Sequence, residues 1–274
     1  MDSSIGCLVE ISHYAAQHPR LVQGGGGNCS VKNGPVMAIK SSGIFLEEIT
    51  ATSGYCLIDL ATGAVSGPSA RPSLEAPLHR LLGRYVIHTH PVALGAFVCS
   101  EEGKKELSLL FPKANHVWVP YSDPGQALFG SMDKIIAEQK LDKDSDLVLF
   151  LQNHGLFVSS SDKEICLLLH EETVSRLEGF LGIRDYPPAA GQAAVLSGFL
   201  TPDHTVYSNL GLESGMSSKQ KTAFSELNAF TVSVLGLIKK MKWTPRFLEA
   251  DTAARILNME EEKHRQQILR QENA

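Results

Sequence analysis

The chain has 274 residues, of which 43% are hydrophobic and 20% are charged, and its formal net charge at pH 7 is −5. This balance is typical of a globular protein and excludes an intrinsically disordered chain. The sequence has no dense stripe of lysine and arginine, which argues against a nucleic-acid partner. It also has no apolar run long enough to cross a bilayer, so we expect no membrane association.

The cysteines and the first residues indicate where the protein works. Five cysteines are scattered along the chain, an odd number without a CxxC pair, which predicts reduced thiols in a reducing compartment. The first residues lack the basic and apolar regions of a signal peptide. We therefore expect a cytoplasmic protein.

The first part of the chain predicts a helix, two β-meanders and a short helix. The dipeptide Asn33-Gly34 is a strong signal for a β-hairpin. Ser73 is a candidate N-cap for the short helix. The expected elements are a helix over 5–17, strands over 29–32, 36–40, 55–59 and 64–65, and a helix over 74–82.

The second part mixes strands and helices, which predicts an α/β sandwich with a largely antiparallel central sheet covered by helices. After Pro187-Pro188 the composition shifts toward glycine, alanine and serine, so we expect a first domain over 1–188. A helical extension over 189–274 would pack on that core or on a neighbouring subunit. The expected elements are strands over 84–90, 116–120, 147–152 and 155–159, and helices over 93–99, 104–110, 163–181, 223–241 and 259–271, with one more from the turn at Asp123-Pro-Gly125 to about 139.

Three histidines in two short motifs point to a catalytic metal. His88 and His90 lie two apart at the end of an apolar strand, so their side chains face the same way and can bind one ion together. His154, followed by Gly155, would arrive from another strand and complete a set of three imidazoles. Such a set leaves a position open for water or substrate, as a catalytic divalent ion requires.

A carboxylate and a glycine run precede these histidines, and each allows two interpretations. Glu75 either caps a helix N-terminus or acts as a general base beside the metal, with burial raising its pKa. His79, four residues later, either orients that carboxylate or makes a structural hydrogen bond. The run over 24–27 is either a flexible loop or a cradle for an anion, together with nearby serines and the cations Lys40 and Arg71.

The order of these motifs resembles the class II aldolase/adducin family, typified by fuculose- and rhamnulose-phosphate aldolases. The resemblance extends from the first helix to about Leu181. The matching motifs are Gly27-Asn28-x-Ser30, Ser42-Gly43, Pro72-Ser73-x-Glu75, His88-x-His90-Pro91 and Asn153-His154-Gly155.

The resemblance implies a role for each matching residue. Glu75 would be the catalytic acid/base, and Tyr121 falls near a family tyrosine that assists proton transfer. The family usually forms fourfold tetramers with active sites at subunit interfaces, which implies a homotetramer. The implied ligands of Zn²⁺, or of Mn²⁺ or Co²⁺, are His88, His90 and His154, and the implied substrate-phosphate residues are Gly27, Asn28, Ser42, Gly43 and Ser73.

Two departures from the fuculose-phosphate type put a phosphorylated substrate in question. Gly25 replaces a threonine, and Leu74 replaces a second serine, so two phosphate hydroxyls are missing. Lys40 or Arg71 would then either compensate or indicate a carboxylate. The stretches 71–79 and 201–207 also resemble the aldolase half of proteins fused to a short-chain dehydrogenase. In the second stretch, Asp203 or His204 either reaches the site or belongs to a turn that leads into a strand.

The leading functional prediction is an enzyme that reversibly cleaves a ketose or ketose phosphate through a metal-stabilised enediolate. An epimerase, dehydratase or decarboxylase of a sugar or keto acid phosphate would use the same site. A non-catalytic, adducin-like interaction module is a third interpretation, against which the intact histidines and Glu75 argue.

Overall fold

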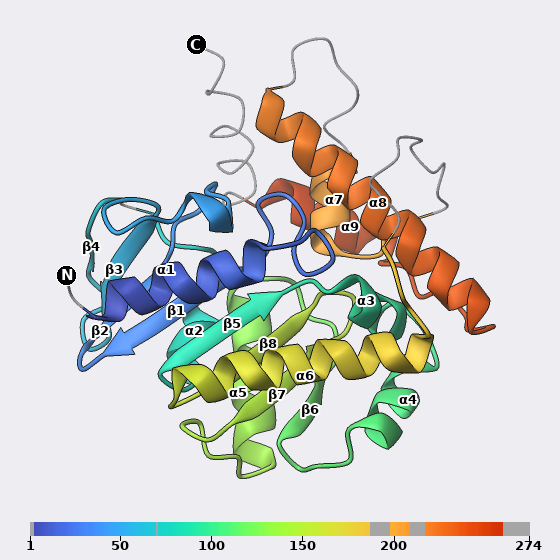
Figure 1. Ribbon diagram of the computed structural model, residues 1–274, viewed down its shortest axis with the longest axis horizontal. Helices are drawn as coiled ribbons and strands as arrows, with labels where there is room; N and C mark the ends of the chain where they lie inside the picture. Colours follow the sequence, from blue (N-terminus) through green and yellow to red (C-terminus); the bar gives the residue numbers. More distant parts are fainter. Residues whose placement is uncertain (1–2, 70, 187–197, 209–216, 260–274) are drawn as a thin grey trace.

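The structure, a computed structural model, describes residues 3–69, 71–186, 198–208 and 217–259, and its centre is one eight-stranded sheet (Figure 1). The strand order is β4-β3-β2-β1-β5-β8-β7-β6, and only β6 and β7 pair in parallel. The predicted α/β class with a largely antiparallel sheet is confirmed. The strands are β1 (Asn28–Asn33), β2 (Val36–Lys40), β3 (Tyr55–Asp59), β4 (Val65–Ser66), β5 (Tyr85–Thr89), β6 (His116–Val119), β7 (Leu147–Leu151) and β8 (Leu156–Ser160).

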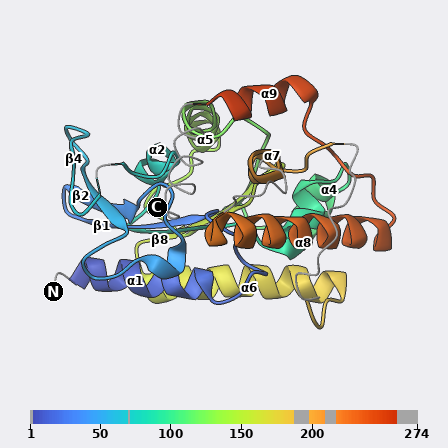
Figure 2. The same cartoon turned by 90° about the horizontal axis from the view of Figure 1, so that it is seen from above.

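Helices cover both faces of this sheet (Figure 2). Helices α1 and α6 lie on one face, and α2 and α5 lie on the other. None of the helices within the described residues is long and apolar enough to cross a membrane. The helices are α1 (Ser3–Ala16), α2 (Ala76–Leu81), α3 (Val92–Val98), α4 (Gly103–Leu110), α5 (Gln126–Glu138), α6 (Lys163–Leu181), α7 (Pro202–Ser208), α8 (Ser218–Lys240) and α9 (Ala250–Asn258), with a 3₁₀ turn η1 (Leu46–Glu48).

Local sequence signals explain the strands that position the site. Gly34 adopts a φ of +57° in the predicted hairpin, where Asn33 pairs with Val36 across β1 and β2. Strand β5 lies between β1 and β8, and every one of its residues is buried. A strand covered on both faces needs a continuous apolar run, which is why Tyr85-Val86-Ile87 precedes the first histidine.

The C-terminal region packs on the rest of the chain through α8. Its side chains join the same hydrophobic cluster as those of α1, α3 and α6. A Cβ on Gly95 of α3 would lie 2.6 Å from Val234 Cγ2 and 3.0 Å from Phe230 Cζ, so only glycine permits this close approach. The expected boundary at 188 falls within 187–197, outside the described residues.

The structure differs from the expected elements in several places. Helix α2 begins at Ala76, two residues later than predicted, with Glu75 and not Ser73 at its N-cap position. Helix α8 begins five residues early because Ser217 and Gln220 form a capping box. The stretch 201–207, expected as a possible turn before a strand, contains most of helix α7, and α9 was not predicted. The expected helix over 259–271 lies, except for its first residue, outside the described residues.

Candidate active site and metal centre

The three predicted metal-binding histidines come together in the structure. Strand β5 carries His88 and leads directly to His90, whose Nε2 lies 3.0 Å from His88 Nε2. His154 arrives from the turn between β7 and β8. All three side chains are buried, and one nitrogen from each lies within 4.8 Å of the others.

Two backbone features bring His154 this close. Asn153 adopts a φ of +52°, which turns the chain sharply after β7. A Cβ on Gly155 would lie 2.4 Å from the carbonyl oxygen of Thr89 and 2.6 Å from His90 Cδ2. Glycine is therefore required after His154, because the β7–β8 turn passes against the other two histidines.

The donor chemistry of the cluster fits a divalent transition metal. Three buried imidazoles are the donor set of many catalytic zinc sites. His88 Nδ1 lies 2.9 Å from the carbonyl oxygen of Leu156, so the Nδ1–H donates there and Nε2 faces the cluster. His88 thus presents Nε2 to the cluster, and one nitrogen each of His90 and His154 lies close to it.

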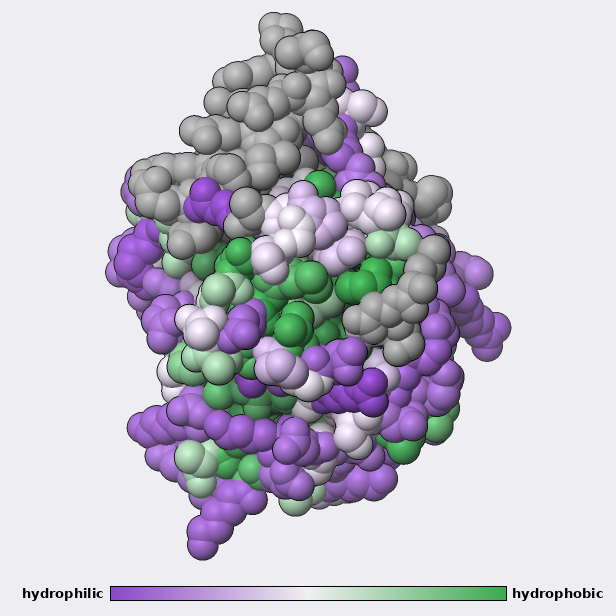
Figure 3. All heavy atoms as spheres, turned by 90° about the vertical axis from the view of Figure 1, so that its left-hand side faces the viewer, coloured by the Kyte–Doolittle hydropathy of each residue, from purple (hydrophilic) through white to green (hydrophobic). Residues whose placement is uncertain are grey.

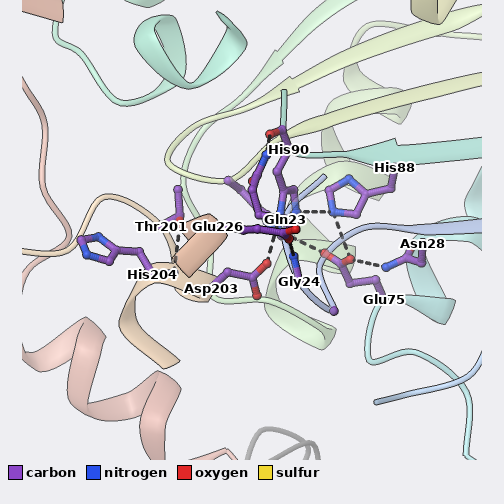
Figure 4. Close-up of polar contacts among 12 residues, drawn as sticks. Gln23, Gly24, Asn28, Glu75, His88, His90, Thr201, Asp203, His204 and Glu226 are labelled. Carbon is purple, nitrogen blue, oxygen red and sulfur yellow. Dashed lines mark hydrogen bonds and ion pairs between the residues drawn. The ribbon is translucent and has the colours of Figure 1, made fainter. Parts of the chain in front are cut away.

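Glu75 faces the same cluster (Figure 4). One carboxylate oxygen lies 3.1 Å from His88 Nε2 and the other 3.1 Å from His154 Nε2. Its side chain makes no capping hydrogen bond to α2, so simple helix capping does not account for it. Burial raises the pKa of Glu75, but attraction to His88 and His154 outweighs burial and holds the pKa well below its usual range. Burial acts in the expected direction, but the net shift is the opposite of the expected rise, so the carboxylate is ionised and able to accept a proton.

A buried hydrogen-bond network holds the side chain of Glu75 in position. Asn28 Nδ2 donates to Glu75 Oε2 at 2.7 Å and to Ser73 Oγ at 3.1 Å. The amide oxygen of Asn28 contacts His79 Nε2, and His79 Nδ1 lies 2.7 Å from Ser30 Oγ. His79 thus acts on Glu75 through Asn28, not by direct contact, and the imidazole selects the orientation of the Asn28 amide.

The predicted substrate-binding residues line one pocket beside this cluster. Its volume of about 50 Å³ is enough for several water molecules. All five predicted positions are present together with Glu75, His90 and His154. The lining residues are Gly25, Gly26, Gly27, Asn28, Lys40, Ser42, Gly43, Ser73, Leu74, Glu75, His90, Pro124, His154, Pro202 and Asp203.

Of the two candidate cations, only Lys40 lines this pocket. Lys40 is 3% exposed, and its Nζ donates to the carbonyl oxygen of Gly25 at 3.0 Å. Arg71 is exposed and is not among the lining residues. The pocket therefore combines a buried ammonium with the side chains of Ser42 and Ser73, which are groups that bind a phosphate or carboxylate.

Tyr121 is not brought to this pocket within one chain. Its hydroxyl donates to Asp123 Oδ1 at 3.1 Å, and it lines a separate pocket beside Arg255 of α9. Burial and the neighbouring Asp123 carboxylate both raise the pKa of Tyr121. The hydroxyl is therefore protonated at neutral pH.

Asp203 reaches the cluster from the C-terminal region, on the other side from Glu75 in Figure 4. Its Oδ2 lies 3.1 Å from His90 Nδ1, and the side chain is 10% exposed. His204, the alternative candidate, turns away and accepts a hydrogen bond from the backbone N–H of Leu200. From the sequence, Asp203 was only one of two candidates to reach the site, because the position of its side chain depends on how α7 packs.

Comparison with known proteins identifies the same part of the chain. Residues 7–178 match the family model described as the class II aldolase and adducin N-terminal domain. The chain is 30% identical over 133 residues to an uncharacterized oxidoreductase, YuxG, of Bacillus subtilis, which covers 48% of this chain and 17% of that protein. It thus spans less than a fifth of that relative, in agreement with the resemblance to the aldolase half of fused proteins.

Two further relatives are an aldolase and a class II aldolase domain by name. An L-fuculose phosphate aldolase of Methanococcus maripaludis is 27% identical over 149 residues, which are 52% of this chain and 77% of that protein. The N-terminal class II aldolase domain of a conserved protein from Thermoplasma acidophilum superposes with a TM-score of 0.56 at 26% identity. That match covers 66% of this chain and 95% of the other.

Proposed function

The chain belongs to the class II aldolase and adducin family, and from this premise we propose that it is a divalent-metal-dependent aldolase acting on a ketose or ketose phosphate. The supporting observation is that three buried histidines, Glu75 and a polar pocket meet at one place. The family makes the protein an aldolase-like lyase; the substrate and the direction of the reaction are our proposal.

We assign His88, His90 and His154 as ligands of the ion, with Zn²⁺ as the first choice and Mn²⁺ or Co²⁺ as alternatives. Three imidazole donors suit each of these metals. When bound, the ion would polarise the substrate carbonyl and stabilise the negative charge of the enediolate left by carbon–carbon cleavage.

Glu75 would move the proton at the carbon that carries the enediolate. Its ionised carboxylate is held toward the pocket by Asn28, so the base needs no rearrangement before it accepts a proton. In cleavage the carboxyl group takes up the proton released by the substrate hydroxyl that becomes the aldehyde and returns a proton to the enediolate carbon. In condensation the ionised carboxylate removes the proton from that carbon to form the nucleophile. Tyr121 remains our candidate for the aldehyde oxygen, although within one chain it lines the other pocket.

Lys40 favours a substrate with an anionic group. The two hydroxyls that the fuculose-phosphate type would supply are absent at Gly25 and Leu74, yet both positions line the pocket next to Lys40. A buried ammonium replaces hydroxyl donors with a full charge, which binds a phosphate or carboxylate more strongly than neutral donors do. Gly27, Asn28, Ser42, Gly43 and Ser73 would contact the same group.

Epimerase, dehydratase and decarboxylase reactions would use the same charge stabilisation, so they remain alternatives that only the products distinguish. A non-catalytic interaction module would have no need for a buried cluster of three histidines beside a carboxylate. We also propose that 1–188 forms the aldolase unit, that 189–274 packs on it or on a neighbouring subunit, and that the enzyme is cytoplasmic, where its five free thiols would stay reduced.

A homotetramer would place this pocket at a subunit interface. The face shown in Figure 3 carries hydrophobic side chains gathered at its centre and hydrophilic ones around them. A contiguous apolar surface of this kind is typical of contacts between subunits. Light scattering coupled to size-exclusion chromatography measures the mass; a monomer would remove this part of the proposal.

The test of the proposed function begins with metal content. Plasma mass spectrometry of protein purified without chelator should find about one divalent ion per chain, because a three-histidine site binds one ion. His154→Ala should lose that ion, while His116→Ala, a histidine outside the cluster, should keep it. Ketoses and ketose phosphates are then screened, with NMR of the products separating cleavage from epimerisation, dehydration and decarboxylation. Failure of the wild-type protein to bind zinc, manganese or cobalt would refute the proposal.

A further inference from the structure

Asp203 approaches the histidine cluster from outside the residues that match the family. It lies on α7, whereas the family match ends at residue 178. Its Oδ2 lies 3.1 Å from His90 Nδ1, while His90 Nε2 lies 3.0 Å from His88 Nε2. One nitrogen of His90 therefore faces the cluster and the other faces a buried carboxylate (Figure 4).

The glycine run allows this contact. A Cβ on Gly26 would lie 2.6 Å from Asp203 Oδ2 and 3.0 Å from His90 Nδ1. A side chain at this position would push the carboxylate and the imidazole apart. The close approach of three segments thus explains why glycine is needed there, independently of any anion that the run binds.

Contacts with the active-site turns hold α7 in place. Asn153 Nδ2 donates to the carbonyl oxygen of Leu200 at 2.9 Å, just before α7. The backbone N–H of His204 donates to Thr201 Oγ1 at 3.2 Å, which secures the first turn. On the other side, Glu226 of α8 accepts a hydrogen bond of 2.7 Å from the N–H of Gly24. One of these contacts therefore joins the residue before His154 to the segment that leads into α7 and Asp203.

We propose that Asp203 is a positioning residue of the metal centre, an inference that rests on the proposed metal site. Its carboxylate would accept the Nδ1–H of His90, which keeps Nε2 deprotonated, directs it at the ion and makes it a stronger donor. His88 uses the carbonyl oxygen of Leu156 for this purpose, at 2.9 Å. Groups that support a metal ligand in this way typically contribute a factor of about 10–100 in metal affinity.

The experiment measures Co²⁺ and Zn²⁺ affinity by competition with a chromophoric chelator. Asp203→Ala should weaken binding by about 10- to 100-fold and should change the visible absorption spectrum of the Co²⁺ form at saturating metal. Asp203→Asn should lose less, because its amide oxygen still accepts from Nδ1–H. Asp251→Ala removes an exposed carboxylate from α9 and should leave affinity and spectrum unchanged.

Each outcome decides the inference. Wild-type affinity and an unaltered Co²⁺ spectrum in both Asp203 variants would overturn it while leaving the proposed function intact. Should Asp203→Ala fail to fold by circular dichroism, Asp203→Asn alone decides by the same two readouts. Absence of metal binding in the wild-type protein would overturn the proposed function and this inference together.

Discussion

Two buried carboxylates approach the histidine cluster from different regions of the molecule. Glu75 stands at the start of α2, within the family match, and contacts His88 and His154 through the nitrogens that face the cluster. Asp203 stands on α7, outside that match, and contacts His90 through its other ring nitrogen. One carboxylate is therefore placed to reach what the cluster binds, and the other to act on a single histidine.

We therefore expect Glu75 to act in proton transfer and Asp203 to act in metal binding. Asn28 ties Glu75 to the core of the family domain through His79 and Ser30. Asp203 depends on the packing of the C-terminal region, which is anchored at Asn153. Substitutions of Glu75 and of the residues that hold it should mainly lower turnover. Substitutions of Asp203 and of the residues that hold it should mainly weaken metal binding.

Glu75→Gln should have the largest effect on turnover. The amide keeps the shape of the side chain but cannot accept the proton, so kcat should fall by about 10²- to 10⁴-fold. Metal content should remain that of the wild type, because the three histidines are untouched. The matched control is Asp203→Asn at saturating metal, which should retain far more turnover. Full turnover by Glu75→Gln on the true substrate would contradict the assignment.

Lys40→Met tests whether the pocket beside Glu75 binds an anionic group through Lys40. The variant keeps the length of the buried side chain and removes the charge. Because a hydrogen bond to a charged group contributes about 1.5–3 kcal/mol, kcat/KM for a phosphate or carboxylate substrate should fall about 10- to 100-fold. Arg71→Met, at an exposed position outside the pocket, should leave it unchanged. An equal loss on a neutral ketose would show that Lys40 does not recognise charge.

The histidine side of the site was predictable because its signals are local. Alternation along a strand places His88 and His90 on one side, and Asn33-Gly34 sets the β1–β2 hairpin on its own. A glycine after His154 indicates a close backbone approach, which the structure explains by the contacts of Gly155 with Thr89 and His90.

The support around those histidines was not predictable, because it depends on packing between distant segments. From the sequence, His79 either oriented Glu75 or made a structural hydrogen bond, and the structure shows that it bonds Asn28 of β1, which in turn bonds Glu75. The direction of the Glu75 pKa depends on two imidazoles brought in by β5 and the β7–β8 turn. Helix α7 has only seven residues, too few for a periodic signal, so the helix could not be inferred and Asp203 was only one of two candidates to reach the site.

His79→Gln should reduce turnover less than the change at Glu75 or Lys40. It removes the imidazole that selects the orientation of the Asn28 amide, so Glu75 loses its fixed position without losing its charge. We expect kcat to fall by about 10-fold, a modest part of what misplaced catalytic groups can lose. His170→Gln is the matched control: that buried histidine bonds Tyr14 and Thr89, so it should lower stability without lowering kcat. Equal losses of kcat in both variants would indicate a general packing defect.

Asn153→Gly should have the smallest effect on turnover and should act on the Asp203 side. Glycine adopts the φ of +52° readily, so the β7–β8 turn is kept, but the bonds from Asn153 Nδ2 to the carbonyl oxygens of Leu200 and Arg246 are lost. Their loss should lower the free energy of unfolding by about 1–3 kcal/mol, measured by urea denaturation. Lys242→Gly is the matched control. Lys242 is exposed and also has a positive φ, of +59°, but its side chain makes no such bonds within the described residues, so this variant should keep the stability of the wild type.

Because Asn153 holds α7, its variant should also bind metal more weakly than the wild type while keeping turnover at saturating metal. If metal affinity stayed constant while stability fell, the position of Asp203 would not depend on this anchor, and the C-terminal region would have to be held against the histidines by other contacts.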